Sequence, residues 1–142
     1  MPACMPPLRK RSARGRTRSA HQRYDCVMAL PEIKRAEAER DLKRFCADRI
    51  PVEYQDQIRY TYRIRGNDIT LFERRPPWDG KGTEWSQLAI ARFRYEPNCN
   101  GWSVSWQRAN GRWLYCDWIG ETARFADALA EVERDVHGAF FG

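Results

Sequence analysis

The sequence has 142 residues and a formal net charge of +6. This length is typical of one domain whose core is large enough to be stable without disulfides or a bound metal. No apolar stretch approaches the length of a membrane span and no secretory signal pattern is present, which favours a soluble, cytoplasmic protein with reduced thiols. The five cysteines include no C-x-x-C pair; they are Cys4, Cys26, Cys46, Cys99 and Cys116.

The whole net charge lies in the N-terminal segment. Residues 1–27 carry seven basic side chains and one acidic one, whereas residues 28–142 carry 18 of each sign. The segment lacks periodic apolar residues, so we expect a basic disordered tail followed by a single domain over 28–142. Three alternatives for the tail stay open: a start codon placed upstream of Met28, an organellar transit peptide, and a basic arm that binds nucleic acid. The balanced charge of the domain lacks the broad positive field of a dedicated nucleic-acid-binding domain.

The domain is expected to begin with a helix. Pro31 suits a first helical turn, apolar residues recur at helical spacing as far as Ile50, and Pro51 ends the pattern. Residues 57–65 then alternate strictly between apolar and polar, which predicts a strand with one buried and one wet face. The wet face carries Arg59, Thr61, Arg63 and Arg65.

A turn at residues 66–68 connects this strand to a partner strand at 69–75, in which Phe72 and Arg74 share a face. Residues 75–87 hold two prolines and two glycines around Trp78 and Trp85, so we expect a long loop. Residues 88–96 read as a third strand.

Four tryptophans lie in residues 101–118, around an Asn110-Gly111 pair that predicts a hairpin with a two-residue type I′ turn. That turn would place Trp106 opposite Tyr115. The apolar face of the hairpin would then consist of Trp102, Val104, Trp106, Trp113, Tyr115 and Ile119. The other face would carry Ser103, Ser105, Gln107, Arg112, Leu114, Cys116 and Trp118. We interpret the aromatic density mainly as core.

Apolar residues from Phe125 to Val136 predict a second helix. The fold class expected is therefore α+β: a five-stranded antiparallel meander sheet with N-terminal and C-terminal helices packed on one face. Phe140 and Phe141 are expected to return to the core as an anchor.

Several segments together are similar to a bacterial family, domain of unknown function 3024. They are the Glu-Arg-Arg before Trp78, the strand AIARFRY, the hairpin WQRANGRWLY and the ending DVHGAFFG. The similarity runs from about Leu30 to Gly142. It implies a small bacterial cytoplasmic protein and implies no activity, and it supports Met28 as the start.

No motif for nucleotide binding, zinc or metalloprotease chemistry is present, so we expect no catalytic residue, no metal and no cofactor. His137 is interpreted as a residue at the C-terminus of the second helix, where its charge suits the helix dipole and Gly138 supplies the left-handed cap, rather than as a general base. Cys99 and Cys116 are interpreted as buried apolar side chains rather than as a nucleophile or redox pair.

The leading interpretation is a non-enzymatic interaction domain that binds a protein partner or forms a homodimer through its open sheet face and the 75–87 loop. An apolar centre of Phe72, Leu114, Cys116 and Trp118, rimmed by arginine, would suit self-association. The alternative is a nucleic-acid-binding protein that uses an arginine and aromatic face together with the tail. Two further alternatives stay open: the outer face could be a solvated surface with no binding role, and the protein could be an enzyme. The candidate binding residues are Arg59, Arg63, Arg65, Phe72, Arg74, Trp78, Trp85, Arg112 and Trp118.

Overall fold

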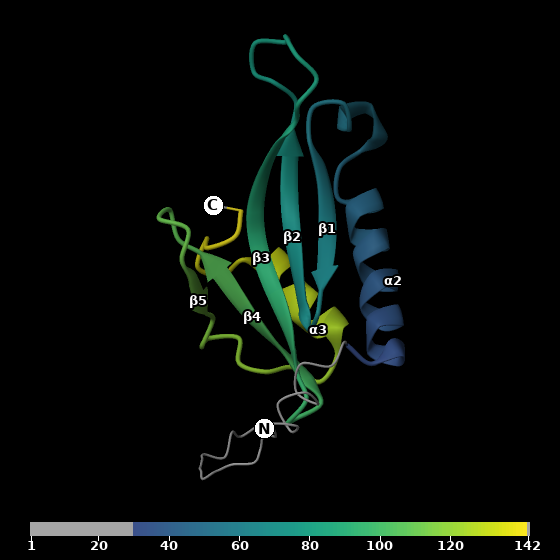
Figure 1. Ribbon diagram of the computed structural model, residues 1–142, viewed down its shortest axis with the longest axis vertical. Helices are drawn as coiled ribbons and strands as arrows, with labels where there is room; N and C mark the ends of the chain where they lie inside the picture. Colours follow the sequence, from purple (N-terminus) through teal and green to yellow (C-terminus); the bar gives the residue numbers. More distant parts are fainter. Residues whose placement is uncertain (1–29, 142) are drawn as a thin grey trace.

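Five strands form one antiparallel sheet in chain order, and two helices cover one side of it (Figure 1). The computed structural model describes residues 30–141, so the expected tail over 1–27 lies outside the described residues. The elements are α2 (Glu32–Asp48), the short 3₁₀ helix η2 (Val52–Tyr54), β1 (Arg59–Arg65), β2 (Asp68–Arg75), β3 (Ser86–Glu96), β4 (Gly101–Gln107), β5 (Trp113–Tyr115) and α3 (Phe125–Arg134). The α+β meander expected from the sequence is confirmed. None of the described helices is both long and apolar enough to cross a membrane.

Helix α2 buries a narrow apolar stripe and leaves its other faces to charged residues. Ala38, Leu42 and Phe45 are buried, at the i, i+4, i+7 spacing that puts side chains on one side of a helix. The stripe packs beside β1, where the ring of Phe45 stacks on Tyr60 with 5.6 Å between centroids. In Figure 1, α2 runs alongside β1 at one edge of the sheet.

The sheet has an inner face toward the helices and an outer face away from them. On β1, Tyr60, Tyr62 and Ile64 contribute to the core, and the three arginines of the strand are exposed on the other face, as predicted: Arg59, Arg63 and Arg65. β3 contains a bulge, because Leu71 pairs with Ala91 whereas Phe72 pairs with Ala89. The alternation of the two faces is therefore interrupted once, on β3.

The β4–β5 hairpin corrects the predicted register by one residue. Trp106 pairs with Leu114, not with Tyr115. Gly111, at φ +90°, donates its N–H to the carbonyl of Arg108 at 2.8 Å, and Asn110 has no positive φ. This geometry is a three-residue loop with a glycine bulge instead of a type I′ turn. A shift of one residue turns every side chain of β5 over, so Trp113 and Tyr115 point outward and Leu114 points inward.

The tryptophan-rich segment supplies core on β4, as expected. Trp102 is fully buried, and its ring packs edge-on against Phe125 of α3 at 5.0 Å and against Tyr95 of β3 at 5.5 Å between centroids. Phe93 lies 4.7 Å from the same Phe125 ring. These four aromatic rings join the sheet to α3.

The end of α3 corrects the predicted cap. The helix stops at Arg134, and Asp135, at φ +47° and ψ +53°, takes the left-handed position that was expected of Gly138. Val136 therefore lies beyond the helix and is exposed. The Asp135 carboxylate accepts backbone N–H bonds from Phe140 and Phe141, at 3.0 and 2.8 Å, and Phe140 is buried in the core as predicted.

Asp135→Ala is expected to lower the free energy of unfolding by about 2 kcal/mol, because two backbone N–H groups lose their charged acceptor. Alanine is also unfavourable at positive φ, since it has no polar side chain that could stabilise this conformation. Asp135→Asn should lose less, since asparagine tolerates this conformation and keeps one acceptor oxygen. Urea denaturation of the full chain measures both losses. Equal stability of Asp135→Ala and the wild type would contradict the role given to this carboxylate.

Candidate functional site

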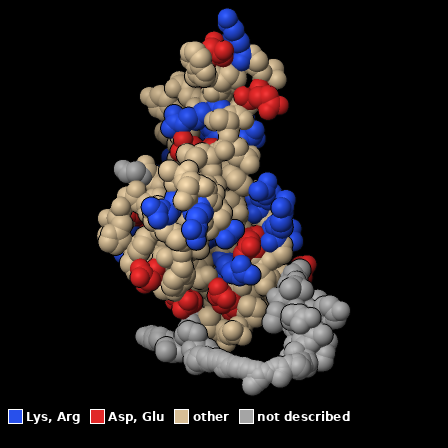
Figure 2. Space-filling view, turned by 60° about the vertical axis from the view of Figure 1, so that its left-hand side comes forward, with Lys and Arg blue, Asp and Glu red and all other residues tan. Residues whose placement is uncertain are grey.

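The described helices do not cover the outer face of the sheet. We call it the arginine face. Its side chains come from alternate positions of all five strands, as the registers require. Those that matter here are Arg59, Arg63, Arg65, Asp68, Thr70, Phe72, Arg74, Arg92, Arg94, Gln107 and Trp113. Figure 2 shows one side of the molecule, with Lys and Arg side chains grouped across its middle.

The arginine face is hollowed at its centre. The hollow has a volume of about 240 Å³. It is lined by Arg63, Arg65, Asp68, Thr70, Phe72, Ala89, Arg92, Gln107 and Trp113. Arg63 and Arg92 lie in one row across the strands, because each pairs with Thr70 of β2 from opposite sides. Two strand spacings, roughly 10 Å, therefore separate their backbones.

Two arginines of the hollow are held on aromatic rings. The guanidinium carbon of Arg63 lies 5.0 Å from the centroid of Phe72, and that of Arg92 lies 4.6 Å from the centroid of Trp113. Phe72 is only 7 % exposed although it lies outside the inner core cluster, so side chains of this face bury it. An arginine held in this way loses little conformational freedom when it binds a ligand.

These arginines are not neutralised by acids. Asp68 forms an ion pair with Arg94 at 3.5 Å, and Glu96 accepts a hydrogen bond from Ser103. Within residues 30–141, neither Arg63 nor Arg92 has a carboxylate at ion-pair distance. Their N–H donors are therefore available to an anion.

Like charges also meet at one end of the face. Arg59 of β1 lies directly opposite Arg74 of β2, a pairing that destabilises a sheet. Arg59 lies over the ring of Trp85 at 4.2 Å. The Nε of Arg74 is buried and has no hydrogen-bond acceptor in the described part of the chain. A buried donor without an acceptor is costly, so this end of the face carries both an unsatisfied N–H group and two like charges.

Most predicted binding residues lie where the sequence led us to expect them. Arg59, Arg63 and Arg65 share the face with Phe72 and Arg74. Trp85 packs under Arg59, whereas Trp78, on the loop between β2 and β3, is 96 % exposed and not folded onto the core.

Two predicted residues do not join this face. Arg112 lies in the loop of the β4–β5 hairpin and does not line the hollow. Trp118 follows the end of β5 and packs edge-on against His137, with 4.7 Å between ring centroids. Arg92 and Trp113 were not predicted from the sequence. Arg92 and Arg94 flank the apolar Phe93, and this alternation indicates that Arg92 lies on the outer face. The position of Trp113 could not be found in this way, because it depends on the register of the hairpin.

The two free thiols, Cys46 and Cys116, and His137 form no reactive group among the described residues, and Cys99, which was expected to be buried, is half-buried. Cys116 is a fully buried free thiol, and burial raises its pKa to about 12. Burial likewise raises the pKa of Cys46 to about 11. Thiols with such pKa values stay protonated at neutral pH and are poor nucleophiles. Within residues 30–141, no three His, Cys, Asp or Glu side chains are grouped so that they could hold a metal ion.

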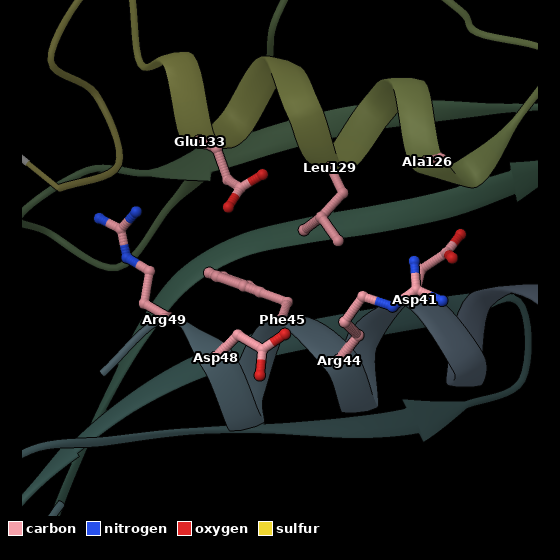
Figure 3. Close-up of a pocket in the computed structure, with 8 residues that line it drawn as sticks. All are labelled: Asp41, Arg44, Phe45, Asp48, Arg49, Ala126, Leu129 and Glu133. Atoms are coloured by element: carbon pink, nitrogen blue, oxygen red, sulfur yellow. The ribbon is translucent and has the colours of Figure 1, made fainter. Parts of the chain in front are cut away.

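A second hollow, of about 360 Å³, lies between α2 and α3 (Figure 3). It is lined by Asp41, Arg44, Phe45, Asp48, Arg49, Ala126, Leu129 and Glu133. Both signs of charge line it, and the Arg49 guanidinium already lies over the Phe141 ring at 4.3 Å. Three carboxylates and two guanidinium groups line this groove, so it lacks the excess of positive charge found on the arginine face.

The fold and the arginine face define a small α+β domain with one uncovered, basic sheet surface. Residues 30–142 match the family described as Domain of unknown function (DUF3024), and the chain belongs to that family. Searches of curated proteins and of solved structures found no match.

Proposed function

We propose that this chain is a non-enzymatic binding domain that holds an anionic partner on its arginine face. The observation that carries the proposal is the pair Arg63 and Arg92, which aromatic rings hold in place and no described carboxylate neutralises. Guanidinium groups in this state suit phosphate and carboxylate groups. Burial raises the pKa of Cys46 and of Cys116, so neither thiol is suited to act as a nucleophile.

An anionic partner fits this face better than a second copy of the chain. Self-association was expected to use an apolar centre that included Leu114, Cys116 and Trp118. Leu114 lies on the inner face of the sheet, Cys116 is buried in the core, and Trp118 lies beside His137, so the outer face lacks that centre. Two copies of one basic face would also repel each other. An acidic protein and a nucleic acid both remain compatible with the charge.

Amide and indole chemical shifts of the isotope-labelled full chain test the proposal during titration with inorganic polyphosphate. We expect the largest shifts at Arg63, Arg92 and the Trp113 indole, and small ones at Arg40 on the solvent side of α2. Saturable shifts on the arginine face would support the proposal. Shifts confined to residues 1–27, or spread evenly over the helices, would overturn it.

A further inference from the structure

Trp78 is the most exposed large apolar side chain among those described, with 96 % of its surface accessible. It lies on the loop between β2 and β3, which projects beyond the end of the sheet in Figure 1. The loop is organised by two hydrogen bonds: the Gly80 N–H donates to Pro77, and the Lys81 N–H donates to the Asp79 carboxylate, at 3.1 and 3.0 Å. Its fold therefore presents the indole to solvent instead of burying it.

The loop joins the arginine face at the end where two arginines lie opposite each other and one N–H group has no acceptor among the described residues. Arg74 is next to the last residue of β2, and Arg59 lies opposite it on β1. The Arg74 Nε lacks an acceptor among the described residues, and the Arg59 guanidinium lies on Trp85, at the other end of the loop. A phosphate group between these two arginines would relieve their repulsion and accept hydrogen bonds from their terminal N–H groups.

We propose that this end of the arginine face binds single-stranded nucleic acid, with backbone phosphates on Arg59 and Arg74 and an unpaired base stacked on Trp78. The inference rests on the proposed function and names the class of anion. A single strand offers both groups the site needs, because its phosphates suit arginine and its open bases stack on exposed aromatic rings. An acidic protein would satisfy the arginines but would leave the role of Trp78 unexplained. A duplex would hide its base faces from the indole.

Fluorescence anisotropy tests the inference with the full chain and four probes: labelled oligothymidylate, an abasic deoxyribose-phosphate oligomer of equal length, the corresponding duplex, and polyglutamate. Trp78→Ala is expected to weaken binding of oligothymidylate roughly 5- to 100-fold and to leave the abasic oligomer unchanged, because only the bases stack. Trp78→Phe should keep most of the affinity. Trp118→Ala, which removes an exposed indole away from the arginine face, is the matched control and should change nothing.

The outcomes separate this inference from the proposed function. If Trp78→Ala leaves oligothymidylate binding unchanged while substitution of Arg63 and Arg92 weakens it, base stacking is overturned and anion binding stands. Polyglutamate binding as tight as that of oligothymidylate overturns the nucleic-acid class in favour of an acidic protein, and preferred binding of the duplex overturns the single strand. Both proposals fail if the affinity for every probe is unchanged by all four substitutions, namely Arg59→Gln, Arg74→Gln and those of Arg63 and Arg92.

Discussion

Trp102→Ala is expected to lower the free energy of unfolding by about 3–5 kcal/mol, the range for removing a large buried aromatic side chain. The fully buried indole fills the space between the sheet and α3, in contact with Phe125 and Tyr95. Its backbone also pairs with Thr122, through N–H···O bonds of 2.7 and 2.8 Å in both directions. A cavity at this point would loosen α3 from β4. Because natural domains are stable by only about 5–15 kcal/mol, the variant should be partly unfolded at 37 °C.

Two further variants test the packing argument. Trp102→Phe should lose less, since it keeps a ring in the cavity and removes an indole N–H that has no acceptor among the described residues. Trp118→Ala, at a side chain that is 39 % exposed, should cost less than about 1 kcal/mol. Guanidinium denaturation followed by circular dichroism measures all three. Similar losses for Trp102→Ala and Trp118→Ala would contradict the assignment of Trp102 to the core.

The overall fold could be predicted because burial leaves a regular trace in the sequence. Residues 57–65 alternate because one side of β1 packs on α2 and the other does not, and the spacing of Ala38, Leu42 and Phe45 reflects the single buried stripe of α2. Proline and glycine marked the loop between β2 and β3. These signals are local, so one sequence was enough to read them.

Details that depend on backbone conformation could not be predicted in the same way. An Asn-Gly pair suits a type I′ turn, but a glycine at positive φ also suits a three-residue loop with a bulge, and the two differ by one residue in register. The bulge placed the side chain of Trp113 on the arginine face and that of Leu114 on the inner face of the sheet. Similarly, Gly138 was a reasonable cap, but the helix stopped at Asp135, where the carboxylate could hold the backbone of Phe140 and Phe141.

In the candidate site, too, some features could be predicted from local sequence and others depend on the three-dimensional arrangement. Arg59, Arg63 and Arg65 followed from alternation within one strand, and the structure keeps them on one face. That Arg63 lies in one row with Arg92 depends on the pairing of both strands with β2, a long-range property. Whether an arginine meets a carboxylate or an aromatic ring depends on three-dimensional neighbours, and this difference is what turns a solvated face into a candidate anion site.

Arg63→Glu combined with Arg92→Glu is expected to weaken polyphosphate binding by the full chain at least about 100-fold at low salt. Each charge-assisted hydrogen bond contributes about 1.5–3 kcal/mol, and reversal adds repulsion to its loss. The logarithm of the affinity should also depend less steeply on the logarithm of the salt concentration, by about one unit of slope for each phosphate that the variant no longer neutralises. Isothermal titration calorimetry at several salt concentrations measures both effects.

The control for this prediction is Arg40→Glu combined with Arg124→Glu, which changes the net charge equally but lies on α2 and just before α3. If the control loses as much affinity, the effect belongs to net charge and not to the arginine face. Arg63→Lys with Arg92→Lys keeps the charge but removes the planar guanidinium, so an intermediate loss would indicate that the stacked geometry contributes to binding. Every variant retains residues 1–27. Binding that survives charge reversal on the arginine face, yet still weakens with salt, would therefore belong to that basic segment.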